Sequence, residues 1–496
     1  MTPIDTGLYY PIDLSAPPTS WHYDRLGTYS DDIQAGFACG AHNRTADGIA
    51  HLRPMNISRD GHIELSDLRF VPIEYDERRL NEGDVLFNNT NSPDLVGKTA
   101  YVARNAAGLA FSNHMTRVRF SKAVDPRFAA IQLHHLWSMK YFLHNCVKHV
   151  NQASISSTDL AKSVPLAVPP LAEQLRIVAK IEELFSELDK GVEALTIARE
   201  QLKGYRQSIL KHAFEGKLTA EWRAQHTHGI RSPQELEVAL GAARIAGDQL
   251  EGTPKLPEGW AYFRVASLCS VVRGGSPRPA GDPKYYGGSI PFLKVADLTH
   301  ALGMHLTTHS FTIKTAGLSK TRMTPPHTLL ISNSGATLGV PKICTFETTF
   351  NDGIAAFLGI PAGYAEYFYF FWEGKTIELR NIDQGAAQPN LNTSILGDTL
   401  VPMCTTEEAQ AIVALLKSSL STIEHLYGEI DQRLGQSAAL RQSILKRAFS
   451  GKLVAQDPMD EPASTLLNRV RTERDGATNK KARKDKNGRS GKKTAA

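Results

Sequence analysis

The stretch RQSILKHAFEGKLTA, residues 206–220, returns later in the chain as RQSILKRAFSGKLVA, residues 441–455. The two copies differ only at three pairs of positions, which are His212/Arg447, Glu215/Ser450 and Thr219/Val454. Chance does not produce a match of this length, so the chain contains an internal duplication. Because a repeat constrains the whole architecture, this duplication decides the fold.

The duplication extends upstream with the same offset of 235 residues, which places Glu173 on Glu408 and Val178 on Val413 without a gap. Apolar residues in both upstream segments recur at steps of mostly three and four: Leu171, Leu175, Val178, Ile181, Phe185, Leu188, Val192 and Leu195, then Val413, Leu416, Leu420, Ile423, Tyr427, Ile430 and Leu434. This spacing is the a/d pattern of a coiled coil. Each segment predicts a helix of about 50 residues, far longer than a typical globular helix.

One such apolar seam alone is typical of a core helix. Two nearly identical seams in one chain indicate instead that the helices pair with each other, because each stripe needs a partner of matching length and period. Both helix starts are marked. Pro169 and Pro170 precede Glu173 in the first copy, and Thr405-x-x-Glu408 predicts a capping box in the second.

The segments in front of the two helices resemble each other more weakly, but their motifs come in the same order. PTSWHYDRLG around Trp21 corresponds to PEGWAYFRVA around Trp260, and HLRPMNI (51–57) to FLKVADL (292–298); GDVLFNNTNSPDLVGK (83–98) corresponds to HTLLISNSGATLGVPK (327–342), and FSNHMTRV (111–118) to FNDGIAAF (350–357). Each half therefore predicts a mixed strand-and-loop domain in front of its long helix. Diverged domains on near-identical helices suggest that the helices share one task while the domains perform two different ones.

We accordingly expect an α+β chain with two mixed α/β domains separated by two long, paired helices. The expected parts are the first domain (1–164), the first helix (165–225), a linker with a short helix (226–258), the second domain (259–400), the second helix (401–458), and a short helix with a basic, disordered tail (459–496). The linker segment SPQELEVALGAARIAG and the segment DEPASTLLNRVRTERDG after the second helix have the same amphipathic character, which extends the duplication.

Composition limits the class of protein further. The formal net charge of +5 is compatible with a polyanionic partner but too small to require one. Five scattered cysteines form no CxxC pair, which argues against a disulfide framework and a zinc ribbon. The N-terminus lacks the features of a signal peptide, and no apolar stretch is long enough to span a membrane. We therefore expect a soluble, intracellular protein.

Catalytic motifs are missing from the sequence. We find no Gly-rich cofactor loop with an NPPY-like tetrapeptide, as an adenine methyltransferase would show, and no GxxxxGK[ST] phosphate loop. RGGSPRP at residue 273 lacks the Lys-Ser/Thr end that holds phosphate and magnesium. His144, Cys146 and His149 are not spaced as ligands on one helical face, so no metal site is expected there. We expect no catalysis by this chain alone.

With these residues in view, the chain resembles the specificity subunits of type I restriction-modification enzymes over nearly its full length. The most specific elements are PLAVPPLAEQLRIVAKIEELF (165–185) and the repeated RQSILK-x-AF-x-GKL, supported by LPEGW (256–260) and GAAQPNLN (385–392). Two features depart from the family pattern. TTEEAQAIV at residue 405 lacks the usual PPLAEQ form, and the first domain begins almost at Met1, so that segment 461–475 is expected to fill the place of an N-terminal helix.

The resemblance implies two target-recognition domains, each of which reads one half of a split, asymmetric sequence in double-stranded DNA. It implies that the helices form an antiparallel coiled coil with a pseudo-two-fold axis, set the spacing, and dock two methyltransferase subunits that recruit restriction and translocase subunits. No cofactor is expected on this chain; S-adenosylmethionine, ATP and Mg would bind to partner subunits. The expected role is non-catalytic, in phage defence and DNA methylation in the cytoplasm.

Recognition domains must present Arg, Lys, Asn, Gln, Ser and Thr side chains to base edges and phosphates, and the loops here offer them. The candidate DNA-binding residues are His42, Asn43, Arg44, Arg53, Asn56, Asn88, Asn91 and Asn113 in the first half, and Arg273, Ser276, Arg278, Lys284, Lys294, Asn333, Ser334 and Asn390 in the second. The candidate partner-binding residues lie in the repeated motif: Arg206, Ile209, Lys211, Phe214, Arg441, Ile444, Lys446 and Phe449.

Two other interpretations stay open at this point. The chain could be a DNA-binding scaffold subunit of another defence system that shares the architecture. Less in keeping with its motifs, it could be a stand-alone methyltransferase or nuclease whose catalytic residues are no longer recognisable. The recognised DNA sequence cannot be deduced from the residues, because contact geometry decides it.

Overall fold

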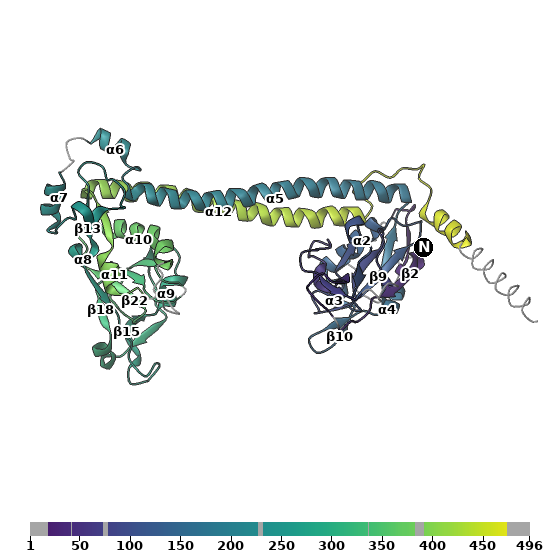
Figure 1. Ribbon diagram of the computed structural model, residues 1–496, viewed down its shortest axis with the longest axis horizontal. Helices are drawn as coiled ribbons and strands as arrows, with labels where there is room; N and C mark the ends of the chain where they lie inside the picture. The colour runs from purple at the N-terminus through teal and green to yellow at the C-terminus, as the bar shows by residue number, and fades with distance from the viewer. Residues whose placement is uncertain are drawn as a thin grey trace, which may run out of the picture. The chain divides into compact units, whose positions relative to one another are not determined.

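The computed structural model describes residues 18–40, 42–72, 78–226, 232–335, 337–381 and 391–473, without the side chains of residues 248 and 249. The chain divides into two compact units, which are residues 1–194 with 433–496, and residues 195–432. Each unit combines one strand-and-loop domain with part of both long helices (Figure 1). The basic tail from Ala477 and the polar residues 382–390 lie outside the described residues.

The two long helices are α5 (Leu171–Phe214) and α12 (Thr406–Phe449), each of 44 residues. Both are shorter than expected because the repeated motif contains its own stop signal. Gly216 has a φ of +71° and Gly451 a φ of +69°, in the left-handed region that ends many helices. The next amide closes each turn, since Lys217 N donates to the His212 oxygen at 2.9 Å and Lys452 N to the Arg447 oxygen at 2.8 Å.

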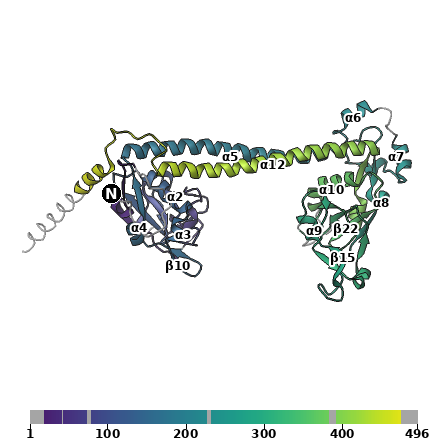
Figure 2. The same ribbon diagram turned by 180° about the vertical axis from the view of Figure 1, so that it is seen from behind.

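The helices pair in an antiparallel coiled coil, and both views show them side by side (Figures 1 and 2). In the first unit Arg441 forms an ion pair with Asp189, and in the second unit Arg199 forms one with Asp431 at 3.5 Å. The partners on α5 are thus ten residues apart, and their partners on α12 are ten residues apart in the opposite direction, as an antiparallel pair requires. Buried and half-buried residues on α12 follow the expected heptad steps: Leu416, Leu420, Ile423, Tyr427, Ile430 and Leu434.

The prediction that Leu175 belongs to the apolar seam is wrong. Leu175 is 52% exposed, while Ile177, Val178 and Ile181 are buried in the core of the first unit. Near its start α5 packs against the strand-and-loop domain instead of α12, so the buried face of the helix turns away from the heptad position of Leu175.

The first domain contains small sheets built from antiparallel strands, with one parallel pair. Their orders are β1-β12, β2-β9-β5-β7, β4-β3-β8 and β10-β11-β6. The strands are β1 (His22–Arg25), β2 (Ser30–Ala35), β3 (Ile49–Leu52), β4 (Arg69–Val71), β5 (Val85–Asn88), β6 (Thr90–Asn91), β7 (Thr99–Tyr101), β8 (Ala110–Phe111), β9 (Met115–Phe120), β10 (Val147–Lys148), β11 (Ala153–Ser154) and β12 (Pro165–Val168). The helices are α1 (Leu26–Tyr29), α2 (Pro126–Ser138), α3 (Tyr141–His144) and α4 (Ser157–Ser163).

The second domain repeats this plan with longer strands. Its sheets have the orders β13-β23, β14-β22-β19-β20-β16 and β17-β15-β21-β18. The strands are β13 (Ala261–Arg264), β14 (Ser270–Arg273), β15 (Tyr286–Leu293), β16 (His305–Leu306), β17 (Phe311–Ile313), β18 (Arg322–Thr324), β19 (Thr328–Ser332), β20 (Pro341–Cys344), β21 (Thr348–Phe350), β22 (Ile354–Leu358) and β23 (Leu400–Met403). The helices are α8 (Val265–Leu268), α9 (Val295–His300), α10 (Ala365–Arg380) and α11 (Thr393–Asp398).

The duplication inferred from weak motifs is therefore visible in the strand order. The core sheet β2-β9-β5-β7 of the first domain corresponds to β14-β22-β19-β20 of the second, and the parallel pair β3-β8 corresponds to β15-β21. In each domain the first strand pairs with the strand in front of the long helix, as β1 with β12 and β13 with β23. The expectation of two mixed α/β domains on a helix pair is confirmed.

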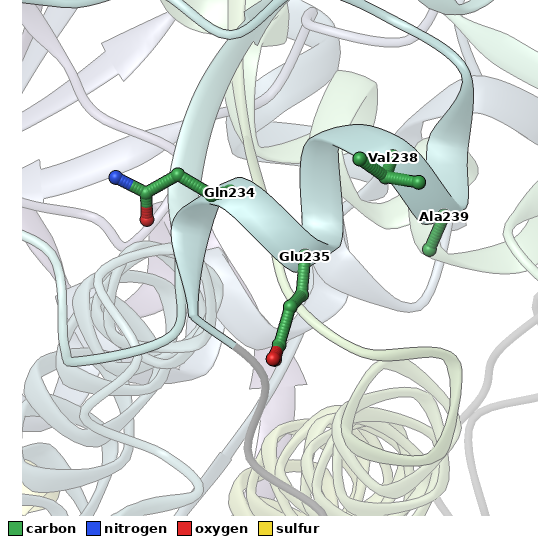
Figure 3. Close-up of a pocket in the computed structure, with 4 residues that line it drawn as sticks. All are labelled: Gln234, Glu235, Val238 and Ala239. Atoms are coloured by element: carbon green, nitrogen blue, oxygen red, sulfur yellow. The ribbon is translucent and has the colours of Figure 1, made fainter.

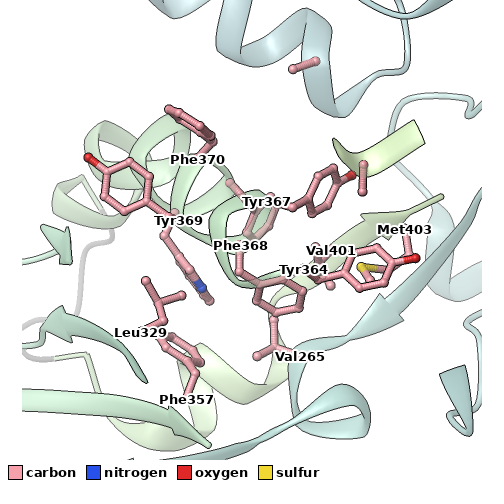
Figure 4. Close-up of a cluster of buried hydrophobic side chains, with 14 of the residues drawn as sticks. Val265, Leu329, Phe357, Tyr364, Tyr367, Phe368, Tyr369, Phe370, Val401 and Met403 are labelled. Atoms are coloured by element: carbon pink, nitrogen blue, oxygen red, sulfur yellow. The ribbon is translucent and has the colours of Figure 1, made fainter. Parts of the chain in front are cut away.

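Each domain packs against one end of both helices. In the second unit the aromatic helix α10 faces the end of α5, and the rings of Tyr367 and Phe371 lie 5.0 and 5.4 Å from that of Phe214. Figure 4 shows the buried cluster around α10, in which Tyr364, Tyr367 and Phe368 lie close to Val401 and Met403 of β23. In the first unit Phe449 of α12 lies 5.6 Å from Phe128 of α2.

Short helices follow both long ones. After α5 come α6 (Ala220–Gln225) and α7 (Pro233–Leu240); after α12, residues 463–473 are helical. The predicted Ser-Pro start of α7 is confirmed, because Ser232 and Glu235 form a reciprocal capping box. The helix at 463–473 packs on the first domain as expected: Ala463 and Leu467 are buried there, and Ala463 N donates to the Ser20 oxygen at 3.2 Å.

Candidate nucleic-acid interface

Three loops meet at one edge of each domain through equivalent backbone bonds. In the first domain Asn89 N donates to the His114 oxygen at 3.1 Å, and Ile155 N donates to the Asn89 oxygen at 2.8 Å. In the second domain Asn333 N donates to the Gly353 oxygen at 2.9 Å, and Leu391 N donates to the Asn333 oxygen at 2.8 Å. Most of the candidate DNA-binding residues lie on or beside these loops.

A fourth loop joins the same edge in both domains. Gly36, which follows β2, donates its N–H to the Met115 oxygen at 3.0 Å, and Gly274, which follows β14, donates to the Ile354 oxygen at 3.0 Å. A Cβ atom on Gly274 would lie 2.3 Å from the Asn351 oxygen, so the close approach of the two backbones requires glycine. The two domains thus share one framework of four loops that carry different side chains.

In the first domain a hollow of about 340 Å³ gathers polar side chains, among them His42, His51, Arg53, Asn113 and His114. His42 Nε2 lies 3.0 Å from His51 Nδ1. Burial lowers the pKa of His51 to about 4, and it also lowers the pKa of His42, aided by the charge of Arg53. Both imidazoles are therefore neutral at neutral pH and offer hydrogen bonds, while Arg53 carries the positive charge.

The other candidates of the first domain differ in their availability. Arg44 and Asn113 are exposed, and Asn91 is half-buried. Asn43 holds its own loop together, because Nδ2 donates to the Asp47 oxygen at 2.8 Å and Oδ1 accepts from Thr45 N at 3.1 Å. Arg44 and Asn113 are the members of this set with the most surface to offer a ligand.

Three predicted contact residues have buried side chains in the chain without DNA. Asn56 is 3% exposed, and its Nδ2 donates hydrogen bonds to the backbone oxygens of Glu64 and Asp67, at 3.1 and 3.2 Å. Asn88 is fully buried and donates to the Pro54 oxygen at 3.0 Å. Asn333 is also fully buried. Asn56 and Asn88 thus bind backbone oxygens of the loops, whereas neither polar side-chain atom of Asn333 has a hydrogen-bond partner among the described residues.

In the second domain the predicted residues Arg273, Ser276 and Arg278 gather around Asp352. Ser276 Oγ donates to Asp352 Oδ1 at 2.6 Å, and Arg278 Nη2 lies 3.8 Å from Asp352 Oδ2. Arg273 Nε donates to the backbone oxygen of Asp352 at 2.6 Å. The hydrogen bond from Ser276, together with the nearby arginines, holds the pKa of Asp352 below its ordinary value, so this carboxylate is ionised at neutral pH.

The remaining candidates of this domain are spread more widely. Lys284 is exposed beside the ring of Tyr285, and Ser334 is half-buried. Lys294 Nζ lies 3.3 Å from the ring centre of Phe311, which occupies it in a cation–π contact. Asn390 lies outside the described residues.

Sequence reasoning missed Asp352, although a signal for it existed. The alignment of FSNHMTRV with FNDGIAAF places Asp352 opposite Asn113, which was chosen as a DNA contact. It also missed two buried lysines at matching positions. Lys98 Nζ donates to the Ile57 oxygen, and Lys342 Nζ donates to the Ala301 oxygen at 2.8 Å. These lysines fasten loops to the core sheet and are not available to a ligand.

The structure divides the candidate partner-binding residues into two groups. Ile209, Ile444 and Phe449 are buried, and Phe214 packs between aromatic rings, so these four belong to the chain's own core. Arg206 is bound to Glu373 at 2.7 Å and Arg441 to Asp189. Lys211 and Lys446 are exposed; the side chain of Lys211 is 72% exposed, and its Nζ lies 3.8 Å from Glu215 Oε1. The apolar residues of the shared motif pack the domains against the helices.

The described residues also include a hollow on a short helix and five cysteines. Helix α7 carries a shallow hollow lined by Gln234, Glu235, Val238 and Ala239, in which Val238 is 82% exposed (Figure 3). No three His, Cys, Asp or Glu side chains of the described residues are placed to hold a metal ion. All five cysteines are free thiols. In the part of the chain that the structure describes, no helix is both long and apolar enough to cross a membrane.

Two loop-bearing domains on an antiparallel helix pair define a class of protein, and comparison with known proteins identifies the family. The family model described as the type I restriction modification DNA specificity domain matches residues 66–195 and 257–433. These two regions cover more than half of the chain and fall in its two halves. The chain therefore belongs to the specificity subunits of type I restriction-modification systems.

Relatives in sequence come from bacteria and archaea. The chain is 24% identical over 343 residues to the type I restriction enzyme EcoDI specificity subunit of Escherichia coli, covering 65% of this chain and 72% of the relative. It is 23% identical to the EcoKI specificity subunit of Escherichia coli strain K12, covering 89% and 92%. The solved HsdS subunit from Thermoanaerobacter tengcongensis matches with a TM-score of 0.54 at 19% identity, covering 88% of this chain and 98% of that one. A structure from a study of type I R-M assembly matches with a TM-score of 0.66 at 18% identity, covering 90% and 100%.

Proposed function

We propose that this chain is the DNA-recognition subunit of a type I restriction-modification complex, in which each domain reads one half of a bipartite, asymmetric target. One observation carries the proposal. The two domains hold the same four-loop framework with the same backbone bonds, but they place different side chains on it. Asn113 and His114 in the first domain stand where Asp352 and Gly353 stand in the second. A shared scaffold with different side chains suits two readers of different base sequences.

The paired helices would set the distance between the two half-sites and dock two methyltransferase subunits. Lys211 and Lys446 are exposed at equivalent positions of the repeated motif, and two copies of one surface suit two copies of one partner. Through the methyltransferase subunits the complex would recruit restriction and translocase subunits. S-adenosylmethionine, ATP and Mg would be bound by those partners, in the cytoplasm where the DNA is. The chain itself would act without a catalytic residue.

A domain exchange tests the proposal. Residues 260–403 are replaced by the equivalent domain of a relative, so that β13 and β23 move together and keep their pairing. The chimera is co-expressed with the methyltransferase subunits, and methylated sites are mapped by long-read sequencing. One half of the methylated sequence is expected to change, while the other half stays the same. A change in both halves would defeat the modular assignment.

A second measurement separates the proposal from a catalytic function. The purified chain is incubated with DNA and S-adenosylmethionine, alone and with the methyltransferase subunits. Methylation is expected only in the presence of the partners. Methylation by the chain alone would assign it to stand-alone enzymes, and a complex that binds DNA without sequence preference would favour a scaffold role in another defence system.

A further inference from the structure

Arg278 and Asp352 form an exposed pair of opposite charge within the four-loop edge of the second domain. Their side chains are 72% and 43% exposed, and 3.8 Å separates Arg278 Nη2 from Asp352 Oδ2. Asp352 lies between β21 and β22, next to Gly353, whose oxygen takes part in the loop junction. Both side chains therefore stand where the proposed function requires contact with DNA.

The loop that carries Arg278 is held from several sides. Gly275 N donates to the Phe350 oxygen at 3.1 Å, and Tyr286 Oη donates to the Pro277 oxygen at 2.9 Å. Ser276 fixes the other carboxylate oxygen of Asp352, Oδ1, at 2.6 Å. The loop thus presents Arg278 and, beside it, Asp352 Oδ2 in a defined arrangement before any ligand binds, which lowers the entropy cost of recognition.

An ionised carboxylate is unfavourable on a surface that contacts only phosphates, because the charges of the carboxylate and the phosphate repel each other. Base edges differ from phosphates in this respect, since cytosine and adenine present amino groups that donate hydrogen bonds in the major groove. A carboxylate at this position is therefore suited to a base and disfavours the backbone. The adjacent arginine offsets its charge and adds donors for a second base.

We propose that Arg278 and Asp352 together read one G·C base pair in the half-site of the second domain, with Arg278 on guanine and Asp352 on cytosine. This inference rests on the proposed function. Guanine O6 and cytosine N4 are hydrogen-bonded to each other, so they lie about 3 Å apart. A guanidinium and a carboxylate oxygen 3.8 Å apart match that spacing. Arg278 would take O6 and N7 of guanine in the bidentate contact that arginine favours.

An A·T pair fits the same two side chains less well. Asp352 could accept from adenine N6, but thymine would give Arg278 one acceptor and a methyl group instead of two acceptors. The pair therefore selects G·C, and reversal of the base pair would bring the carboxylate against the acceptors of guanine. Loss of either side chain is expected to reduce the preference at this position by roughly ten- to a hundred-fold.

The test uses the complete complex and a DNA library in which the half-site of the second domain is randomised. Wild type, Arg278→Ala and Asp352→Asn are compared by sequencing the methylated molecules. Wild type is expected to require G·C at one position, and both variants are expected to relax that same position while the other half-site and the spacing stay unchanged. Glu347→Gln is the matched control, because Glu347 is an exposed acid of the same domain and its loss removes the same charge.

Ser276→Ala distinguishes base recognition by Asp352 from support of its loop. The variant removes the hydrogen bond to Asp352 Oδ1 but leaves Oδ2, the oxygen that would face cytosine. It is expected to weaken DNA binding and to keep the G·C preference. The inference is overturned if Arg278→Ala and Asp352→Asn relax the base preference at different positions, or if neither variant changes the preference at any position. It is also overturned if Asp352→Asn and Ser276→Ala both weaken the base preference equally at all positions of the half-site. A wild-type complex that methylates no bipartite sequence would instead overturn the proposed function itself.

Discussion

The indole nitrogen of Trp260 donates a hydrogen bond of 2.9 Å to a buried carboxylate oxygen of Glu408. Trp260 stands at the start of the second domain, and Glu408 lies in the first turn of α12. Three residues before the tryptophan, Pro257 lies against Gly216 at the end of α5, where a Cβ would come within 2.4 Å of the proline ring. The segment Pro-x-x-Trp thus fastens the end of one long helix to the start of the other.

The first unit repeats this clamp with a different charge balance. Trp21 Nε1 donates to Glu173 Oε1 at 3.1 Å, and Pro18 lies against Gly451 as Pro257 lies against Gly216. In the second unit the glutamate also binds an arginine, whereas Glu173 accepts its other hydrogen bond from the neutral amide of Gln456 at 2.6 Å. The two clamps should therefore respond differently to mutation and to pH.

Removal of the carboxylate of Glu408 should destabilise the second unit strongly. Glu408 is 2% exposed and accepts from Trp260, from Thr219 at 2.7 Å, and from Arg223 in a close ion pair. Glu408→Ala removes a buried carboxylate from the indole of Trp260 and from Arg223, whose side chain is only 14% exposed, which costs about 3–5 kcal/mol. Urea unfolding followed by Trp fluorescence measures the loss. Glu407→Gln, which changes the exposed neighbour, is the control, and equal effects of the two variants would contradict the clamp.

Glu173 should behave in the opposite way at neutral pH. Burial raises the pKa of Glu173, although the hydrogen bonds from Gln456 and Trp21 oppose this shift. Oε2 has no hydrogen-bond partner among the described residues. Because the folded-state pKa is raised, the carboxyl contributes stability that is present below its unfolded value and lost as the pH rises through the folded value.

Glu173→Gln is therefore expected to stabilise the first unit at neutral pH and to lose this advantage as the pH falls through the raised folded-state value toward about 4.5, the ordinary value. Thermal unfolding across this pH range measures the difference. Glu182→Gln, at a side chain that is 56% exposed, is the control. A Glu173→Gln variant that is less stable than wild type at neutral pH would show that the charged form is the one the fold prefers.

The sequence predicted the helix pair because its signal is redundant. Two copies of one motif, an offset without gaps and a heptad seam all indicate the same arrangement. The capping box at Thr405 was only half right. Thr405 Oγ1 accepts from Glu408 N at 3.3 Å, but the carboxylate of Glu408 turns to Trp260 instead of the backbone. A local pattern predicts the local bond and cannot show a distant partner that competes for the same side chain.

The candidate site was predicted less well than the fold, for a related reason. Asn56 and Asn88 are predicted as DNA-binding loop residues, but their side chains bind backbone oxygens inside the domain. Residue type does not show which side of a loop faces solvent. Asp352 is not among the predicted residues, because the contact types considered are basic or neutral polar side chains. Its role becomes visible only when folding brings it beside Ser276 and Arg278, far from it in sequence.

The repeated motif contains both core and surface positions. Mutation of a core position should lower stability, and mutation of a surface position should not. Phe449 is fully buried against Phe128, and Phe449→Ala should cost about 3–5 kcal/mol in the stability of the first unit, because it removes a large core side chain and leaves a cavity. Lys446→Ala, at an exposed position three residues earlier, should leave stability within about 0.5 kcal/mol of wild type. Thermal unfolding measures both variants.

Sedimentation of lysine variants with the methyltransferase subunits tests the docking proposal. Lys211→Ala and Lys446→Ala are expected to weaken assembly while each variant stays folded, since both lysines are exposed. If neither lysine affects assembly, the partner does not bind at this face of the motif. A Phe449→Ala variant with unchanged stability would instead restore that residue to the partner-binding set.

The proposed spacing role of the helices can be tested by a matched deletion. The ion pairs Asp189–Arg441 and Arg199–Asp431 mark facing positions on α5 and α12, so residues 192–198 face residues 432–438. Removal of both segments deletes one heptad from each helix and keeps the seam and both ion pairs. The paired helices should shorten by about 10 Å at 1.5 Å per residue, which corresponds to roughly three base pairs at 3.4 Å each.

The methylated sequence should therefore keep both half-sites while the spacer between them becomes about three base pairs shorter. Affinity should fall as well, because three base pairs also rotate the second half-site by roughly 100° around the duplex, whereas a heptad is close to two full helical turns. Long-read mapping of methylation measures the spacer directly. Deletion of residues 192–198 alone is the control, since it breaks the register of the pair and should abolish assembly. A matched deletion that methylates the original spacer would show that DNA or partner subunits, and not the helices, determine the spacing.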